Sequence, residues 1–330
     1  PGGHSGSLYI FKDAHEDDPA KRYKAMVQNK TPGMKLDLYY SEDAFRWTPY
    51  VGNPVVETSR RVEGWDPAGY IGWGPIDFMG WDPIREVYGV HMENSLHLRS
   101  PMTKRLIGRA ESRDMTEWSE PETILLPDEL DSPDTEFYGM SVMTYEGIYV
   151  GLPWIYRTTN TTHHVELAFS RDGTHYDRPY REPFIQRGAG SEFDCNSIYG
   201  RSPLLHGDRI LFFYHGLNYR SRETLLALGD KATGAVGLAT LPLDEFVSLD
   251  GVKGAPSMDV APYSEMVTRS FGFAGSRLFL NVRAALQGEG PVELRVEVLE
   301  PNHHRIDGFQ FDDADPIIES GQSRVVSWKG

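Results

Sequence analysis

One local pattern recurs four times along the chain and limits the possible folds more than any other feature. Each copy holds an apolar strand, a tight turn and a second strand rich in aromatic residues. The copies span residues 8–27, 76–92, 140–156 and 202–216. Their turns fall at Asp18-Pro19, Asp82-Pro83, Glu146-Gly147 and Gly207-Asp208. Turns that contain Pro or Gly between two such strands predict a β-hairpin in every copy.

A third expected strand follows each hairpin and ends in a polar turn. Three copies, at 38–49, 108–121 and 166–179, share Ser-x-Asp followed by an aromatic residue four positions after the Asp; the copy at 237–250 is degenerate. The aromatic residues are Trp47, Trp118 and Tyr176. We interpret the repeated Asp43, Asp114 and Asp172 as turn caps, whose side chains accept hydrogen bonds from nearby backbone N–H groups.

Repeats of this kind, without helical periodicity between them, predict an all-β fold. Residues 1–250 are expected to form a β-propeller with four visible blades. Residues 251–330 lack the Ser-x-Asp turn but contain alternating strands at 278–282 and 293–299, which predict a C-terminal antiparallel β-sandwich. The alternative for the first part is a β-sandwich whose hairpins resemble one another by coincidence.

Charge and cysteine content exclude several functions. The formal net charge of −15 argues against nucleic acid or an anionic membrane as a partner. Cys195 is the only cysteine, so neither an internal disulfide nor a cysteine-based metal cluster is possible. His163 and His164 are adjacent and would point to opposite faces of a strand, so we predict no metal site there. No stretch of about 20 apolar residues and no leader peptide is present, which favours the cytoplasm but leaves the compartment open.

Acidic residues at the blade entrances are the candidate functional groups. The innermost strand of a blade lines the central channel, where a charge costs desolvation energy unless it is paired or functional. Each of the acids has aromatic neighbours, and carboxylates beside aromatic faces suit a sugar site. The predicted catalytic residues are Glu136, Asp77 and Asp194. The predicted substrate-binding residues are His4, Ser5, Trp73, Tyr138, Arg201 and His215. No cofactor or metal is expected, although a structural Ca²⁺ is compatible with the channel.

Glycoside hydrolysis uses two carboxylates, one protonated acid and one nucleophile or base. Glu136 lies beside Phe137 and Tyr138, and such neighbours would raise its pKa and suit it to proton donation. Asp77 would then orient the substrate or stabilise charge.

The blade entrances resemble those of glycoside hydrolase family 32, the invertases and fructan hydrolases, and of their relatives that cleave arabinosides and xylosides. The resemblance is carried by HSGS (4–7), by PIDFMGWDPIREVYGV (75–90) and by the segments around Glu136 and Asp194. It implies a five-bladed propeller, with Asp77 stabilising the transition state and Glu136 as general acid. The motifs differ from the family pattern at Ile76, Phe78 and Phe137.

The resemblance also implies that the nucleophile belongs to a blade preceding HSGS, so we expect this chain to be a fragment that lacks its first blade. The expected activity is hydrolysis of a small or terminal, furanosidic sugar unit in an oligosaccharide, polysaccharide or small glycoside. A non-catalytic sugar-binding propeller, such as a lectin or sensor, is an alternative. Glycosyl transfer or phosphorolysis is another, and phosphorolysis would need a cationic cluster near Glu136, for which Arg60, Arg61 and Arg201 are candidates. The oligomeric state is left open.

Overall fold

The fold is taken from a computed structural model, which describes residues 5–29, 34–58, 76–97, 103–220, 222–251, 264–283 and 293–329. The chain forms two compact units, residues 1–240 and 241–330. The domain boundary expected after residue 250 stays a prediction. In the described ranges, no helix has the length and apolar character needed to cross a bilayer.

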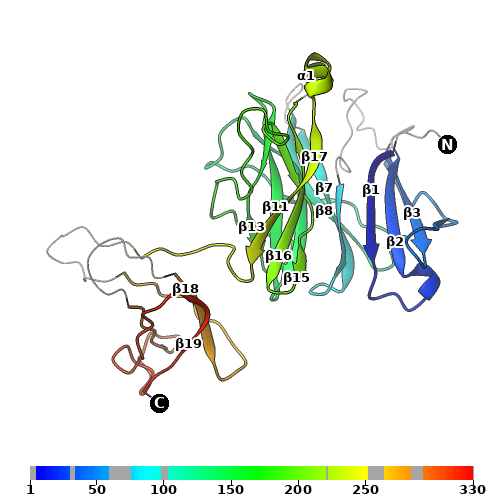
Figure 1. The fold of residues 1–330 in the computed structure, drawn as a ribbon. Coiled ribbons are helices and arrows are strands. Elements are labelled where there is room, and N and C mark those ends of the chain that lie inside the picture. Colours follow the sequence, from blue (N-terminus) through cyan, green and yellow to red (C-terminus); the bar gives the residue numbers. More distant parts are fainter. Residues whose placement is uncertain are drawn as a thin grey trace. The chain divides into compact units, whose positions relative to one another are not determined.

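The first unit is built almost entirely from antiparallel strands, as predicted (Figure 1). Its first blade is a sheet of order β1-β2-β3-β4, with β5 also paired to β3. The elements are β1 (Ser5–Lys12), η1 (Pro19–Lys21), β2 (Tyr23–Asn29), β3 (Met34–Ser41), β4 (Thr48–Pro49) and β5 (Val56–Thr58). The second blade has the order β6-β7-β8-β9. Its strands are β6 (Ile76–Asp82), β7 (Val87–His97), β8 (Thr103–Ser112) and β9 (Glu122–Leu125).

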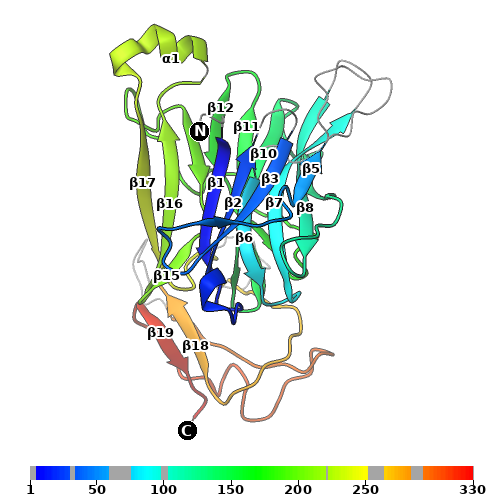
Figure 2. The same ribbon diagram turned by 90° about the vertical axis from the view of Figure 1, so that its right-hand side faces the viewer.

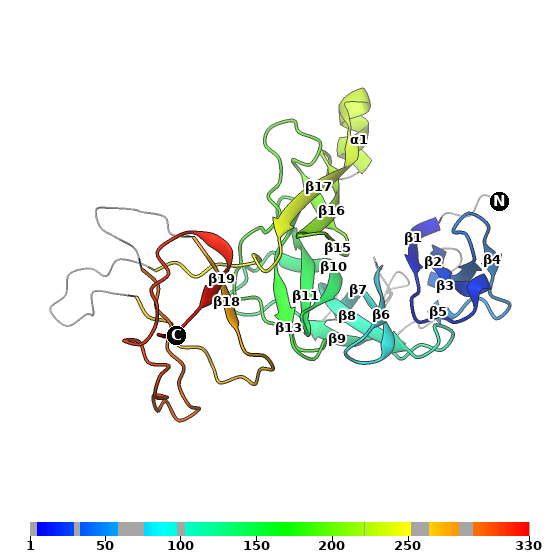
Figure 3. The ribbon, with the colours of Figure 1, turned by 60° about the horizontal axis from the view of Figure 1, so that its bottom comes forward.

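The third and fourth blades meet in one eight-stranded sheet, because β12 and β14 pair in parallel at His163 and Ser197. The third blade holds β10 (Thr135–Tyr145), β11 (Ile148–Arg157), β12 (Thr162–Val165) and β13 (Ala168–Ser170). The fourth holds β14 (Ser197–Gly200), β15 (Leu204–His206), β16 (Arg209–Leu217), α1 (Arg222–Leu228), η2 (Gly229–Lys231) and β17 (Gly234–Pro242). Figure 3 shows the four blades following one another in chain order, and Figure 2 gives the view with β1, β2 and β3 in front. The predicted β-propeller is therefore confirmed.

Apolar side chains fill the spaces between neighbouring blades. Met26, Leu36 and Ile76 are fully buried in the cluster shared by the first two blades. Ile107 and Phe137 are buried in the cluster shared by the second and third. Burying one such side chain contributes about 1.5 to 3 kcal/mol. Packing between blades therefore fixes how the inner strands meet.

The repeated Ser-x-Asp turns have the predicted structure. Asp172 Oδ1 accepts hydrogen bonds from the backbone N–H groups of Thr174 and His175, each at 2.8 Å. Asp43 and Asp114 accept the corresponding two bonds in their own turns. The backbone bonds from His175 and Thr174 lower the pKa of Asp172. These recurring acids are architectural, as the sequence indicated.

The second unit contains one antiparallel pair, β18 (Leu278–Val282) with β19 (Gly321–Val326). Isolated bridges join Leu294 to Ile317 and Ala314 to Trp328. These contacts agree with an antiparallel β unit, and the C-terminal β-sandwich stays a prediction.

Candidate functional site

The predicted site residues are described to different extents. His4 and Trp73 lie outside the described residues, as do Arg60 and Arg61. Ser5 begins β1, but its side chain is also outside the description. The other predicted residues are placed by the structure: Asp77, Glu136, Tyr138, Asp194, Arg201 and His215.

Asp77 lies where the inner strands of three blades meet. It is the second residue of β6 and only 5% exposed. Its carboxylate accepts a hydrogen bond from Ser202, which follows β14. The Ser141 hydroxyl of β10, which donates to the Gly200 carbonyl, also interacts with it, and Arg201 Nη1 lies 3.8 Å from Oδ1. Burial raises the pKa of Asp77 to about 6, against the opposing effects of these partners. Its carboxyl group therefore exchanges a proton close to neutral pH.

Aromatic rings surround Arg201 beside this carboxylate. The guanidinium lies 5.5 Å from the centre of the Trp154 ring on β11 and 5.9 Å from that of Tyr9 on β1. Tyr199 meets Trp154 edge-to-face at 5.5 Å, and its ring centre is 6.3 Å from that of His215. Four blades thus contribute to the surroundings of Asp77 and Arg201, and His215 belongs to the same cluster.

A glycine allows the Trp154 ring to lie against β10. The β6 and β10 strands carry a bulge at the same place, after Phe78 and after Phe137. A Cβ at Gly139 would lie 2.5 Å from a carbon of the Trp154 ring, so a larger residue would displace the ring. The bulge in β10 also sets the position of Tyr138, whose ring centre is 6.2 Å from that of Tyr199.

His163 is a buried, neutral member of the aromatic cluster. Its ring stacks on Tyr156, with centres 4.6 Å apart, and Nδ1 lies 3.1 Å from Ser197 Oγ. Burial, and secondarily Arg105, lowers the pKa of His163 to about 3. Within the described part of the chain, His163 Nε2 and Trp154 Nε1 are buried without a hydrogen-bond partner. Buried polar atoms normally have partners, so these two mark the cluster as a place where a ligand or water is expected.

Glu136 lies on the same face of the third blade as this aromatic cluster, but its partner is a different residue, Arg105. It is 7% exposed and accepts a hydrogen bond of 2.5 Å from Arg105 Nη1 of β8. The Arg105 guanidinium also lies over the Tyr138 and Tyr156 rings, at 5.8 and 5.5 Å. A cationic group therefore does lie beside Glu136, and it is Arg105, which the sequence did not suggest; Arg60 and Arg61 are outside the described residues.

Asp77 and Glu136 share no hydrogen-bond partner among the described residues. Asp77 is linked to Ser141 of β10, which lies five positions after Glu136 along the strand. Glu136 is linked to Arg105 of β8. The carboxylate pairs of glycoside hydrolases are about 5 to 9.5 Å apart. In the described part of the chain, the aromatic cluster links the two acids, and no direct contact joins their carboxylates.

Asp194 lies on the other face of the fourth blade. It accepts a hydrogen bond of 2.8 Å from Tyr214, while the neighbouring His215 pairs with Tyr199. Successive side chains of a strand point to opposite faces, so Asp194 and His215 are on different sides of β16. No contact among the described residues joins Asp194 to Asp77.

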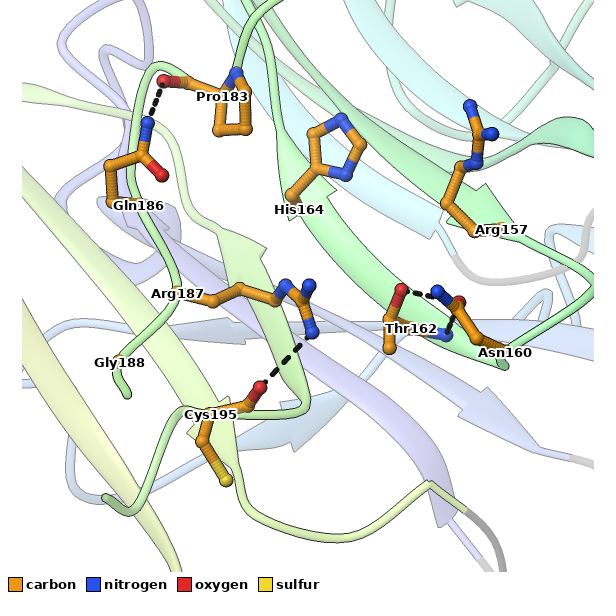
Figure 4. Close-up of a pocket in the computed structure, with 9 residues that line it drawn as sticks. All are labelled: Arg157, Asn160, Thr162, His164, Pro183, Gln186, Arg187, Gly188 and Cys195. Atoms are coloured by element: carbon orange, nitrogen blue, oxygen red, sulfur yellow. Dashed lines mark hydrogen bonds between the residues drawn. The ribbon is translucent and has the colours of Figure 1, made fainter. Parts of the chain in front are cut away.

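Two of the cavities in the described part of the chain lie outside the Asp77 cluster. One of about 550 Å³ is lined mainly by the hairpins and polar turns of the first two blades, with Tyr40, Trp81 and Arg113 among its residues. The other, of about 340 Å³, lies beside β11 and β12 (Figure 4). The described residues contain no group of three or more His, Cys, Asp or Glu side chains placed to hold a metal ion. The expectation about cofactors and Ca²⁺ stays untested.

Sequence reasoning noted Tyr199 only as an aromatic neighbour of Asp194, and it did not identify Arg105, Trp154, Tyr156, His163, Ser141 and Ser202 as members of this region. The sequence of β11 did contain a sign of the aromatic cluster. Trp154 and Tyr156 are two positions apart, so they lie on the same face of the strand. The predicted opposite orientation of His163 and His164 is confirmed, because they pair with Tyr156 and Ile155 respectively. Only His163 joins the aromatic cluster.

Comparisons with known proteins show the fold but no family. No family model matches the sequence, and no curated protein matches it. A solved N-acetylgalactosamine deacetylase from F. plautii, in complex with blood group B trisaccharide, is similar in structure, with a TM-score of 0.52 and 15% identity. The match covers 74% of each chain.

Two further solved structures are similar over less of their length. A structure described as a glycoside hydrolase has a TM-score of 0.49 and 12% identity, over 66% of this chain and 62% of that one. The β-1,2-mannobiose phosphorylase from Listeria innocua, in complex with β-1,2-mannobiose, has a TM-score of 0.49 and 13% identity, over 73% of this chain and 59% of that one. This chain therefore spans less than two thirds of both proteins.

Proposed function

We propose that the chain is a glycoside hydrolase acting on a small or terminal sugar unit, with Asp77 as one of its catalytic carboxylates. The observation that carries this proposal is the state of Asp77, which is 5% exposed and has a pKa raised to about 6 by burial. A buried carboxyl group destabilises the fold when it is ionised. Such groups are therefore expected at functional sites. A pKa near the working pH also suits proton transfer.

The surroundings of Asp77 support a sugar as the ligand. Trp154 and Tyr199 supply aromatic faces, while Arg201 and His215 supply polar groups beside them. Sugars are recognised by this combination of stacking surfaces and hydrogen-bonding groups. The structurally similar deacetylase is in complex with a trisaccharide, which agrees with a sugar ligand but leaves open which bond this chain cleaves.

The raised pKa of Asp77 suits the proton donor, the role that the sequence suggested for Glu136. Glu136 accepts a hydrogen bond from Arg105 and shares no hydrogen-bond partner with Asp77 among the described residues. We therefore propose that Asp77 transfers the proton. Glu136 then serves in sugar binding at the far side of the aromatic cluster. Specificity for furanosides stays a prediction.

A non-catalytic sugar-binding protein is the second candidate. The observation that favours it is that both carboxylates face a guanidinium, Asp77 that of Arg201 and Glu136 that of Arg105. Paired carboxylates can bind sugar hydroxyls without any proton transfer. Such a protein would bind sugars with Arg201 and the aromatic residues unchanged but would release no product.

A panel of aryl and methyl glycosides, covering furanosides and pyranosides, tests the proposal through product release. The variants are Asp77→Asn and Glu136→Gln, and Glu129→Gln is the control because Glu129 is exposed at the surface. For a proton donor, Asp77→Asn is expected to reduce turnover of a methyl glycoside by about 100-fold or more. It should reduce turnover of a dinitrophenyl glycoside much less, because that leaving group departs without a proton.

The other outcomes are equally informative. Equal losses on both substrates would assign Asp77 to charge stabilisation instead of proton donation. Full activity of Asp77→Asn would contradict the proposal. Sugar binding that requires Arg201 and Tyr199, without turnover of any substrate, would establish the non-catalytic alternative.

A further inference from the structure

The cavity of about 340 Å³ beside the third blade is separate from the Asp77 cluster (Figure 4). It lies between the end of β11, the start of β12 and the segment 183–195. Its lining residues are Arg157, Asn160, Thr162, His164, Pro183, Gln186, Arg187, Gly188 and Cys195. The volume falls at the lower end of the range for small-molecule sites, about 300 to 1,000 Å³.

Strand pairing puts this cavity and the aromatic cluster on opposite faces of one two-stranded ribbon. Arg157 pairs with Thr162 across β11 and β12, and Tyr156 pairs with His163. Because side chains alternate along a strand, the first pair and the second point to opposite faces. The cavity therefore does not belong to the site proposed above.

The lining of the cavity is cationic in a strongly acidic protein. The chain has 48 Asp and Glu against 33 Lys and Arg, yet none of the nine lining residues is acidic. Arg157 is held in place by Asp134 at 2.6 Å and by Thr135 at 3.0 Å. His164 lies 3.1 Å from Glu166, which also pairs with Arg178. Arg157 and His164 are thus each held by an acid that does not line the cavity.

Arg187 differs because its partners are carbonyl groups. Its Nη1 donates to the carbonyl oxygens of Cys195 at 3.0 Å and Asn196 at 3.4 Å. Among the described residues its guanidinium forms no ion pair, although carboxylate oxygens of Glu192 and Asp194 lie beside the neighbouring Gly188. Figure 4 shows this guanidinium extending toward Thr162 and Asn160, with His164 above it in the view. The carbonyl bonds orient the group while its positive charge stays available to a ligand.

Asn160 adds a donor on the same side. Its Oδ1 accepts hydrogen bonds from the Thr162 backbone N–H at 3.2 Å and from the Thr162 hydroxyl at 2.6 Å. The acceptor end of the amide is therefore occupied, which leaves the NH₂ end to the cavity. A fixed guanidinium with neighbouring N–H donors is the arrangement that binds multiply charged oxyanions.

We propose that this cavity binds an oxyanion of the phosphate or sulfate type, either free or attached to a small sugar. The charge of Arg187 and the donors of Asn160 recognise the anion, and the cavity volume leaves space for one sugar ring. The site is independent of the proposed glycosidase activity, because it needs neither Asp77 nor turnover.

Isothermal titration with inorganic phosphate, inorganic sulfate and glucose 6-phosphate tests the proposal, with chloride used to hold the ionic strength constant. The wild-type protein is expected to bind at least one of them with a Kd below about 10 mM. Arg187→Gln should weaken that binding about tenfold or more, because a charge-assisted hydrogen bond is lost. Arg171→Gln, which removes the same charge from an exposed turn, should leave it unchanged.

A second variant covers the case in which Arg187→Gln does not fold. Asn160→Asp keeps the two bonds to Thr162 but adds a negative charge, so it should abolish binding. Tighter binding of glucose 6-phosphate than of phosphate would identify a phosphorylated sugar as the ligand, and equal binding would identify the free anion. Absence of binding by all three probes, or wild-type affinity in both cavity variants, would overturn the proposal.

Discussion

The two ends of strand β6 hold two buried aspartates that are bonded very differently. Asp82, at the end, accepts hydrogen bonds from Arg109 at 2.6 Å and from the Tyr149 hydroxyl of the next blade at 2.8 and 2.9 Å. Asp77, near the start, has two serine hydroxyls as its close side-chain partners, and the guanidinium of Arg201 is 3.8 Å away. Asp82 is therefore paired with a buried charge, and Asp77 is not.

The Asp82 arrangement recurs one blade earlier. Asp13, just after β1, pairs with Lys24 of its own blade and accepts a hydrogen bond of 2.6 Å from Tyr88 of the next. Burial opposes the ionised form of Asp13, but the bonds from Lys24, Tyr88 and the His15 backbone prevail and lower its pKa. Tyr88 and Tyr149 occupy the same position, the second residue of the second strand of a blade. A buried acid at this end of an inner strand therefore joins one blade to the next.

The comparison separates structural acids from functional candidates. An acid that recurs between blades and has a charged partner stabilises the fold. An acid that is buried with mostly neutral partners, and whose pKa is raised as a result, destabilises the fold and is expected to serve a function. By this criterion Asp77 is the candidate functional residue, while Asp13 and Asp82 have a structural role.

The largest expected effect concerns Asp82. Asp82→Ala would leave Arg109, whose side chain is 2% exposed, with only Glu111 as an acidic partner. Breaking a buried ion pair in this way costs about 3 to 5 kcal/mol of unfolding free energy. Urea unfolding measures the loss, with Glu129→Gln as the unaffected control. A loss below about 1 kcal/mol would show that the Asp82 bonds do not join the blades.

A smaller effect is expected from the titration of Asp77. The unfolded chain releases this proton near pH 4, whereas the folded protein holds it to about pH 6. The folded state therefore loses stability as the pH rises through this interval, by on the order of 2 to 3 kcal/mol. Asp77→Asn removes the titrating group, so the variant should be more stable than the wild type at pH 7.5 and nearly equal to it at pH 4. A constant difference at all pH values would show that the pKa of Asp77 is not raised.

The smallest effect concerns the repeated turns. Ser170 is 4% exposed, and its Oγ accepts hydrogen bonds from the backbone N–H groups of Asp172 and Gly173. Ser170→Ala is expected to lower the unfolding free energy by about 1 kcal/mol. Ser191→Ala, at an exposed position, is the control and should change it by less than about 0.5 kcal/mol. Equal results for both variants would mean that the turn does not contribute to stability.

The sequence predicted those parts of the structure that depend on neighbours along the chain. The hairpins, the caps formed by Asp43, Asp114 and Asp172, and the opposite orientation of His163 and His164 are all local. The position of Asp77 at the start of an inner strand also followed from the repeat.

The partners across blades could not be predicted in this way. Whether Arg105 of β8 reaches Glu136 of β10 depends on how β10 passes the second blade, and no repeat unit encodes that geometry. For the same reason the sequence grouped Asp194 with Asp77, although the structure places Asp194 against Tyr214 on the other face of the fourth blade. Packing between sheets decides these contacts.

The most direct test is to measure stability and turnover side by side for Asp77→Asn, on whichever glycoside the substrate panel identifies. The account predicts a protein at least as stable as the wild type at pH 7.5, with turnover of a poor leaving group reduced by about 100-fold. A variant that is less stable but hydrolyses the glycoside at the wild-type rate would show that Asp77 is one more structural acid.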